Sequence, residues 1–322
     1  MTKNKEFVGI DISKDYFDVC YPGGKYDRFA NSNKGFKQLL KTLNASSHCV
    51  MEQTARYYEP LAFYLKENGI AVTVENGLVI KRFMQMHLKT AKTDKADAKL
   101  IQHYGEVFRP KEWCAPSESI LYSKELGSLS IQLKKQKTSL SNQLHSIKKS
   151  AGGNEFAQEI IKRQISQIKA DLKAIEKEIE LLIKADYPDL YTHLKSIPGI
   201  GKKTAMLLII FTNGFKNFEN SKQLISYFGL APQVKESGSS VRGKGNISKS
   251  GNRKMRSQLY ICAWSASKYN QSCKAMYERM IHKGKSKNKA LIAVSNKLLK
   301  QALAVAKSGM PYDPNFKSVR PM

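Results

Sequence analysis

The chain has 322 residues, 41% of them hydrophobic, which is enough to build at least one full core and excludes a disordered tail. Its 54 Lys and Arg against 27 Asp and Glu give a net charge of +27, so we expect a polyanionic partner, with nucleic acid favoured over a membrane. The apolar run at 205–211 is far shorter than the about 20 residues that a membrane-spanning helix needs. No signal-peptide pattern precedes the first strand pattern, so we expect a cytoplasmic protein.

Residues 5 to about 107 alternate between two hydrophobic periods, which predicts an α/β domain. Strand patterns occur in FVGIDIS, FDVCYP, KYDRFA, HCVMEQ and IAVTVEN, and helical patterns in GFKQLLKTL and PLAFYLKENG. The segment RPKEWCAPSES then breaks the order with two prolines. We therefore expect a first domain over residues 1–112.

Four acidic residues stand out in this basic domain: Asp11, Glu52, Asp94 and Asp97. The first two lie at strand patterns, where Gly9 is expected to leave room beside the Asp11 carboxylate, and the other two lie three apart, on one face of a helix. Each acid alone is most often a cap or a surface charge. Together they are typical of a pair of Mg²⁺ ions about 3.5 to 4 Å apart, which serve phosphoryl transfer.

Residues 119 to 185 change to a heptad pattern, and a turn at 150–154 divides it in two. This predicts a helical hairpin over residues 113–190, either packed within the chain or forming a coiled coil between subunits. Such a hairpin is expected to carry little chemistry of its own. The two seams consist of Leu126, Leu133, Leu140 and Ile147, and of Ile161, Ile165, Ile168, Leu172, Ile175, Ile179 and Leu182.

The third region, residues 191–322, holds 24 Lys and Arg against four acids, so +20 of the net charge lies here. It is predicted to be helical with glycine-rich breaks. In SIPGIGKKTA, Gly199 and Gly201 indicate a tight turn that opens a helix, whose first N–H groups and Lys202 and Lys203 can hold a phosphate. This is typical of a helix-hairpin-helix, although a plain helix start after a turn fits as well.

The segment 228–258 combines glycines and serines with basic residues, which indicates a phosphate-binding loop. A serine beside a metal-bound phosphate can act as a covalent nucleophile, although loop serines more often serve turn geometry. The basic residues are Arg242, Lys244, Lys249, Arg253, Lys254 and Arg256.

Five widely spaced cysteines form no CxxC pair, and the six histidines are scattered. The cysteines are therefore predicted to be reduced and mostly buried thiols. Neither a histidine metal site nor a Ser-His-Asp triad is indicated.

Taken in order, GID at 9–11, VMEQT at 50–54, KTDKADA at 92–98, IPGIGKKTA, FGLAP, ESG and SKSGNRKMR resemble the DEDD transposases of insertion sequences. This is the IS110 group, which includes the Piv-type DNA invertases, and the resemblance covers nearly the whole chain. One departure is that the family usually has glycine after Thr54, where this chain has Ala55.

The resemblance implies an RNase H-like (RuvC-like) N-terminal α/β domain, a central α-helical coiled coil and a mainly α C-terminal transposase domain. Asp11, Glu52, Asp94 and Asp97 would form its metal-binding tetrad, with two Mg²⁺ per site and Mn²⁺ as a substitute. Ser237 of ESG would be the nucleophile, with Ser239 and Ser240 close by.

The implied partners are donor and target DNA, a non-coding guide (bridge) RNA, and further subunits in a dimer or tetramer, with no membrane involved. A bacterial, nucleoid-associated location follows from these partners. The implied activity is Mg²⁺-dependent strand cleavage and rejoining through a phosphoserine. Two alternatives stay open: a metal-only nuclease of the Holliday-junction type, and a nucleic-acid-binding protein without catalysis.

Overall fold

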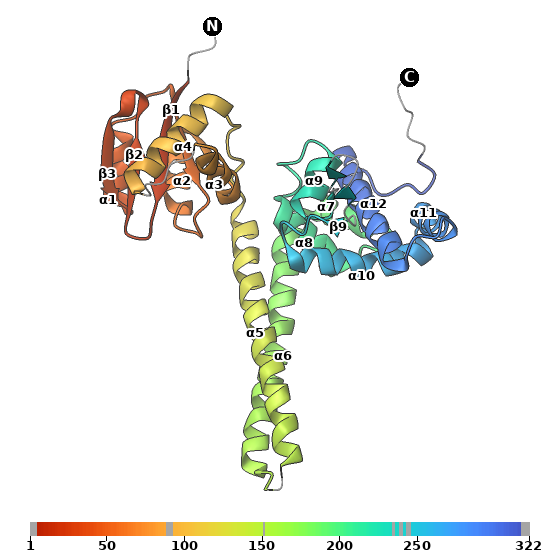
Figure 1. Cartoon of the computed structure of the whole chain (residues 1–322). Helices are drawn as coiled ribbons and strands as arrows, with labels where there is room; N and C mark the ends of the chain where they lie inside the picture. Colours follow the sequence, from red (N-terminus) through yellow and green to blue (C-terminus); the bar gives the residue numbers. More distant parts are fainter. Residues whose placement is uncertain are drawn as a thin grey trace. The chain divides into compact units, whose positions relative to one another are not determined.

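The computed structural model describes residues 5–87, 93–150, 152–233, 236–237, 241–242 and 246–316 (Figure 1). The chain forms two compact units, residues 1–115 and 116–322. The predicted boundary at residue 190 falls inside the second unit. The reason is that Ile120 and Ile183, at the base of the predicted hairpin, are fully buried in the same core as the helices that follow.

The first unit is built on a mixed five-stranded sheet in the order β3-β2-β1-β4-β5. β1 pairs antiparallel with β2, and β2 with β3, whereas β1, β4 and β5 run parallel. All five predicted strand patterns are strands. Their bounds are β1 Glu6–Ile12, β2 Tyr16–Cys20, β3 Tyr26–Ala30, β4 Ser47–Glu52 and β5 Ala71–Glu75.

Helices cover both faces of this sheet. The alternation in β1 sends Val8, Ile10 and Ile12 into a core with side chains of the first two helices, and sends Phe7 into a second core with the next two. The helices are α1 Asn33–Leu40, α2 Glu59–Glu67, α3 Gly77–Met86 and α4 Asp94–Phe108, with a short 3-10 turn at Pro22–Gly24.

Gly9 marks the closest approach of α4 to the sheet. A Cβ at Gly9 would lie 2.2 Å from the backbone N of Gln102 and 2.3 Å from the carbonyl O of Ala98. The expectation that Gly9 leaves room for the neighbouring carboxylate is therefore wrong, because the backbone of α4 fills that space. Since backbone atoms cannot rotate away, this contact fixes α4 against β1.

His48 in β4 is a fully buried histidine. Its Nε2 lies 2.8 Å from Oγ1 of Thr73, and that hydroxyl donates to the carbonyl O of Lys111, so Nε2 carries the proton. Nδ1 faces the ammonium of Lys5 at 3.4 Å, and Lys5 also pairs with Glu112 at 3.0 Å. Burial and then the Lys5 charge lower the pKa of His48 to about 4.

We expect acid to destabilise the first unit through His48. The pKa of His48 is about 4 in the folded protein and 6.5 in the unfolded chain. As the pH falls from 6.5 towards 4, the unfolded chain takes up a proton that the folded protein does not, so the free energy of unfolding decreases. Between pH 8 and pH 5 the loss should be about 2 kcal/mol relative to His48→Gln. Urea unfolding at both pH values measures it. The exposed His145→Gln should keep the wild-type pH dependence, and equal dependence in all three proteins would contradict the prediction.

The second unit begins with two long helices, α5 Glu118–Lys149 and α6 Glu155–Asp186, which lie side by side within the chain (Figure 1). The Asn154 side chain accepts a hydrogen bond from the Ala157 N–H at 3.1 Å and starts α6. Ile161, Ile168 and Ile175, one heptad apart, are buried. The two arms therefore pack against each other within the chain, whereas a coiled coil between subunits stays a prediction.

The remaining helices enclose the core of the second unit. This agrees with the prediction of a helical region with glycine-rich breaks. Between the third and fourth of them lie two short antiparallel pairs, β6 with β9 and β7 with β8. The helices are α7 Pro188–Lys195, α8 Lys202–Thr212, α9 Ser221–Tyr227, α10 Arg253–Tyr269, α11 Gln271–His282 and α12 Lys287–Ser308, and the strands are Pro232–Gln233, Glu236–Ser237, Val241–Arg242 and Asn246–Ile247.

The predictions for cysteines and membrane spans agree with this fold. All five cysteines are free, and four of them are buried. Over the described ranges, none of the helices combines the length and the apolar character needed to cross a membrane.

Candidate functional site

Two of the predicted carboxylates meet at one end of the sheet. Asp11 is the last residue but one of β1, and Glu52 is the last residue of the parallel strand β4. The strands pair with Ile10 opposite Met51, so Asp11 and Glu52 occupy the next position on each strand. Both residues are half-buried. This is the edge at which parallel strands of α/β sheets place ligands.

Helix α4 adds the other two carboxylates. Asp94 and Asp97 lie in its first turn, after Thr93, whose hydroxyl accepts from the Ala96 N–H at 3.2 Å. Burial first, and then the charges of Asp97, Asp94, Glu52 and Asp18, raise the pKa of Asp11 to about 7. Glu52, Asp94 and Asp97 therefore all lie within electrostatic reach of Asp11.

This donor set fits a divalent cation in its chemistry. Carboxylate oxygens are the hard ligands that Mg²⁺ prefers, and a cation would relieve the repulsion that acts on Asp11. Among the described residues, no three His, Cys, Asp or Glu side chains are already arranged to hold one ion. Asp94 is instead paired with Arg28, whose Nη2 donates to its Oδ2 at 2.9 Å. The Asp94 carboxylate therefore already has a positively charged partner.

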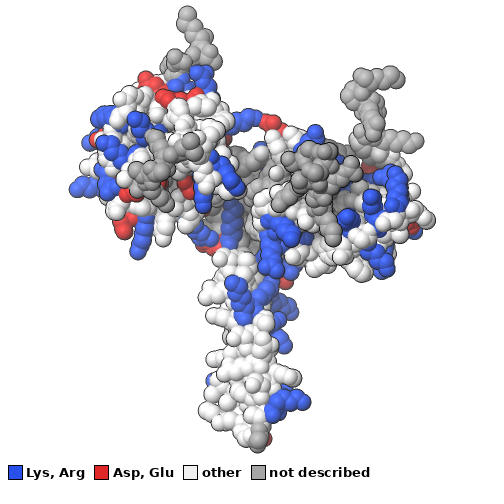
Figure 2. Space-filling model, viewed as in Figure 1, with Lys and Arg blue, Asp and Glu red and all other residues white. Residues whose placement is uncertain are grey.

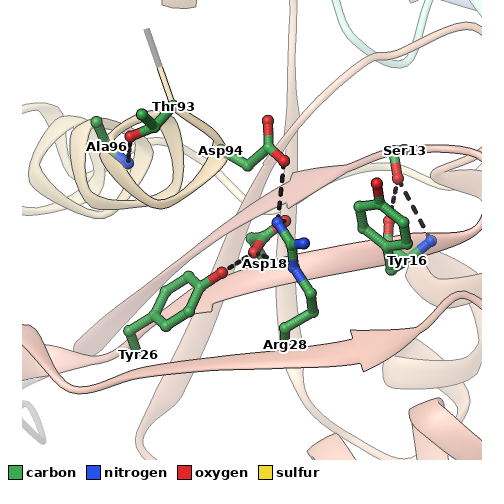
Figure 3. A network of polar contacts seen from close by, with 8 residues as sticks. All are labelled: Ser13, Tyr16, Asp18, Tyr26, Arg28, Thr93, Asp94 and Ala96. Carbon is green, nitrogen blue, oxygen red and sulfur yellow. Dashed lines mark hydrogen bonds and ion pairs between the residues drawn. The ribbon is translucent and has the colours of Figure 1, made fainter. Parts of the chain in front are cut away.

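Asp18 and Arg28 are the part of the site that the sequence analysis missed (Figure 3). Asp18 lies opposite Asp11 in the β1–β2 register and is only 2% exposed. Arg28 donates from Nε to its Oδ1 at 2.9 Å and from Nη2 to its Oδ2 at 3.1 Å, and the Tyr26 hydroxyl also donates to Oδ1. Arg28 therefore bridges a buried carboxylate and Asp94. One signal in the sequence could have indicated Asp18. It is a charged residue between Phe17 and Val19, inside the strand pattern FDVC.

The surroundings of Glu52 also depend on small residues. A Cβ at Gly77, the first residue of α3, would lie 2.6 Å from Oε1 of Glu52, so the glycine makes room for the carboxylate. Ala55, which stands where the family usually has glycine, has a φ of 47°. This left-handed conformation favours glycine, which explains the family preference in physical terms.

The predicted helix-hairpin-helix turn joins α7 to α8. Gly199 has a φ of 105°, and a Cβ there would lie 2.7 Å from the Cβ of Ala266. Gly201 precedes the first residue of α8, and a Cβ there would meet nothing within 4 Å. The Nζ of Lys202 lies 3.9 Å from Oε1 of Glu180 in α6. The sharp turn and helix start are as expected, whereas phosphate binding by this turn stays a prediction.

The predicted nucleophile lies in a short strand pair. Ser237 in β7 pairs with Val241 in β8, and Glu236 pairs with Arg242, in an antiparallel register. Ser239, Ser240 and Lys244 lie outside the described residues, as do the side chains of Ser237 and Arg242.

The basic residues that follow have different environments. Lys249 is exposed with a φ of 57°, and Arg253 is exposed at the start of α10, where Lys254 is half-buried. Arg256 donates from Nη1 to the carbonyl oxygens of Phe228, Ser250 and Gly251 at 3.2, 3.4 and 3.1 Å. These contacts give Arg256 a structural part in holding the loop ends together, beside its predicted contact with nucleic acid.

A mixed sheet with acids at the ends of two parallel strands and in a facing helix is compatible with an RNase H-like DEDD domain, a class of metal-dependent enzymes that act on nucleic-acid phosphodiesters. The sequence profile of a DEDD transposase family, described as "Transposase", matches residues 8–150. That of the "Transposase IS116/IS110/IS902 family" matches residues 191–278. The chain belongs to the IS110 family of transposases.

Individual relatives agree with this assignment. The chain is 29% identical to the pilin gene-inverting protein of Moraxella bovis, over 96% of this chain and 98% of that one. It is 22% identical to the transposase for insertion sequence element IS1111A of Coxiella burnetii, over 92% and 88%. The protein is accordingly a DNA recombinase with DNA substrates, and its DEDD domain implies the use of a divalent metal.

Proposed function

We propose that this protein is the transposase of an insertion sequence, which cuts and rejoins DNA through a Mg²⁺-dependent phosphoserine on Ser237. The observation that carries the metal-dependent part is the gathering of Glu52, Asp94 and Asp97 around Asp11, where burial first and then their charges raise the pKa of Asp11 to about 7. The names of the relatives, a gene-inverting protein and a transposase, support rejoining as well as cutting. They favour the recombinase over a metal-only nuclease and over a binding protein without catalysis.

Asp11, Glu52, Asp94 and Asp97 would hold the cations, two Mg²⁺ per site with Mn²⁺ as a substitute. Bound there, the cations would supply positive charge for the phosphate under attack and for the leaving oxygen. The protein's own contribution is to keep four acids on two strand ends and one helix turn. The Gly9 contact with α4 maintains this arrangement.

Strand exchange proceeds in two balanced steps. The Ser237 oxygen forms a bond to phosphorus and loses its proton to solvent, while the phosphorus–oxygen bond to one strand end breaks and that oxygen takes up a proton. The oxygen of a hydroxyl on a second strand then forms a bond to phosphorus and loses its proton to solvent, while the bond from phosphorus to the serine oxygen breaks and that oxygen takes up a proton. The phosphodiester bond count is unchanged, so rejoining needs no nucleotide cofactor.

The partners in this proposal are donor and target DNA, a bridge RNA that pairs with both, and further subunits in a dimer or tetramer. The net charge of +20 in residues 191–322 supports binding of several phosphates by the second unit. The resemblance adds the guide RNA and the subunits.

Ser237→Ala should abolish a covalent protein–DNA adduct. Purified protein, Mg²⁺ and the RNA that co-purifies with it are incubated with labelled donor-end DNA, and denaturing gels that retain protein-linked strands show the adduct. Wild type and Ser250→Ala, which changes an exposed serine later in the same segment, should form it equally. Ser239→Ala and Ser240→Ala test the neighbouring candidates.

The opposite result identifies a different enzyme. Metal-dependent cleavage without an adduct, undiminished by Ser237→Ala, would mean that water attacks and that the protein is a metal-only nuclease.

A further inference from the structure

A cleft of about 540 Å³ lies in the second unit, where the two arms of the hairpin meet α8 and the start of α10. Its walls come from α5, α6 and α8, three helices that are in mutual contact. All its lining residues belong to the second unit, whereas the four predicted carboxylates belong to the first. Its volume is in the range of small-ligand sites, about 300 to 1,000 Å³.

The rim of the cleft is strongly basic. Seven lysines line it against one acid among its described lining residues, Glu176. Figure 2 shows Lys and Arg side chains gathered on the part of the hairpin next to the C-terminal helices, whereas most of the visible surface nearer its tip is uncharged. The lysines are Lys124, Lys134, Lys137, Lys169, Lys173, Lys203 and Lys254.

Three of these lysines lie close enough to repel one another. Burial first, and then Lys203, lower the pKa of Lys134, and burial followed by Lys134 and Lys203 lowers that of Lys254. They come from α5, α8 and α10, so the fold brings them together from three places in the sequence. Like charges held together in this way are stabilised by a bound anion.

Two helix starts add to the positive field. Lys203 is the second residue of α8, and Lys254 is the second residue of α10. Asn252, which also lines the cleft, caps α10 by accepting from the Met255 N–H at 3.1 Å. Helix N-termini carry partial positive charge and favour phosphate.

The floor of the cleft is apolar. Ile175, Met206 and Ile210 are buried beneath it, and Leu207 and Phe211 are partly exposed to it. A simple anion would leave this surface in contact with water. The cleft therefore suits a ligand that joins phosphates to a flat, weakly polar group.

We propose that this cleft binds a single-stranded segment of nucleic acid, with phosphates on the lysine rim and one unstacked base against Leu207 and Phe211. The occupant is a polymer because seven lysines exceed the charge of one nucleotide. It is single-stranded because a base inside a duplex is stacked and cannot reach the floor. The inference rests on the proposed function in one respect, that this enzyme handles DNA and RNA strands. It also gives the hairpin a chemical role that the sequence analysis did not expect.

Binding of a fluorescent single-stranded oligonucleotide tests the rim. The triple variant Lys134→Gln, Lys203→Gln, Lys254→Gln should weaken binding about tenfold more than Lys283→Gln, Lys285→Gln, Lys289→Gln, which removes the same charge from exposed positions. In a plot of the logarithm of the binding constant against the logarithm of the salt concentration, the slope should become shallower by about 2 for the cleft variant. Parallel titrations with DNA and RNA of one sequence identify the preferred strand. Equal losses in both triple variants would overturn the proposal.

Crosslinking of the wild-type protein tests the floor without any mutation. An oligonucleotide with one photoreactive thio-base should crosslink within residues 203–211, and excess unlabelled single strand should compete better than duplex or inorganic polyphosphate. Crosslinks elsewhere, or equal competition by polyphosphate, would refute base binding. Both readouts measure binding alone, so they stand even if Ser237 forms no adduct.

Discussion

Asp11→Asn should reduce metal-dependent strand cleavage by on the order of a thousandfold while leaving the protein folded. The substitution removes one oxygen ligand and one negative charge from the centre of four acids. Because neighbouring charges and burial already disfavour the Asp11 carboxylate, its loss should also leave the melting temperature of the first unit unchanged or slightly raised. Loss of function without loss of stability is the signature of a group placed for chemistry.

The measurement combines cleavage rates with melting curves recorded with and without Mg²⁺. Mg²⁺ should stabilise the wild type, because it binds the folded state, and should stabilise Asp11→Asn much less. Asp15→Asn, an exposed acid after the same strand, is the matched control and should behave as wild type. Equal stabilisation of both variants by Mg²⁺ would show that Asp11 is not a ligand.

Arg28→Gln should destabilise the first unit strongly, with a fall of roughly 10 °C in its melting temperature. Asp18 is 2% exposed, and without Arg28 its main remaining partner is the Tyr26 hydroxyl. Only Asp18 of this pair is buried, since the Arg28 side chain is 45% exposed. Removing Arg28 leaves the buried carboxylate without its charged partner, which costs more than the pair itself contributes.

The double variant Asp18→Asn, Arg28→Gln separates this cause from a general loss of packing. It should recover at least half of the lost melting temperature, because no buried charge is left. Arg82→Gln, an exposed arginine on α3, should melt as wild type. If the double variant melts as low as Arg28→Gln, the buried Asp18 charge is not the cause.

The strands of the first unit could be predicted from the sequence because each is a short run rich in β-branched and aromatic residues, bounded by turn residues. β4 is buried along almost its whole length rather than on one face. The acids at their ends could be located for the same reason, since a strand end fixes where a side chain lies. Asp18 and Arg28 could not be found in this way. Their place in the site depends on the contact of β2 and β3 with α4, through the ion pair of Arg28 with Asp94. These residues are far apart in the sequence.

The helices of the second unit could be predicted from the sequence, but the cleft that its lysines line could not. In α6 the predicted seam contains the buried Ile161, Ile168 and Ile175, and glycines locate the breaks. In α5 the buried residues are instead Ile120, Ser123 and Ser130, which lie outside the predicted seam. Lys134, Lys203 and Lys254 belong to three helices, and only the folded hairpin brings them to one cleft. Lys203 and Lys254 were predicted to contact nucleic acid from two different motifs, with no indication that they share a site.

The contact between Gly9 and α4 has a consequence for engineering. Because β1 and the backbone of α4 touch without an intervening side chain, Asp94 and Asp97 move as one body with that helix. A change that shifts α4 would alter the distances from Asp94 and from Asp97 to Asp11 together, so the geometry of the proposed metal site cannot be adjusted at one of these two acids alone. Any engineered variant of the enzyme should therefore keep the part of α4 that touches Gly9, residues 98–102, unchanged.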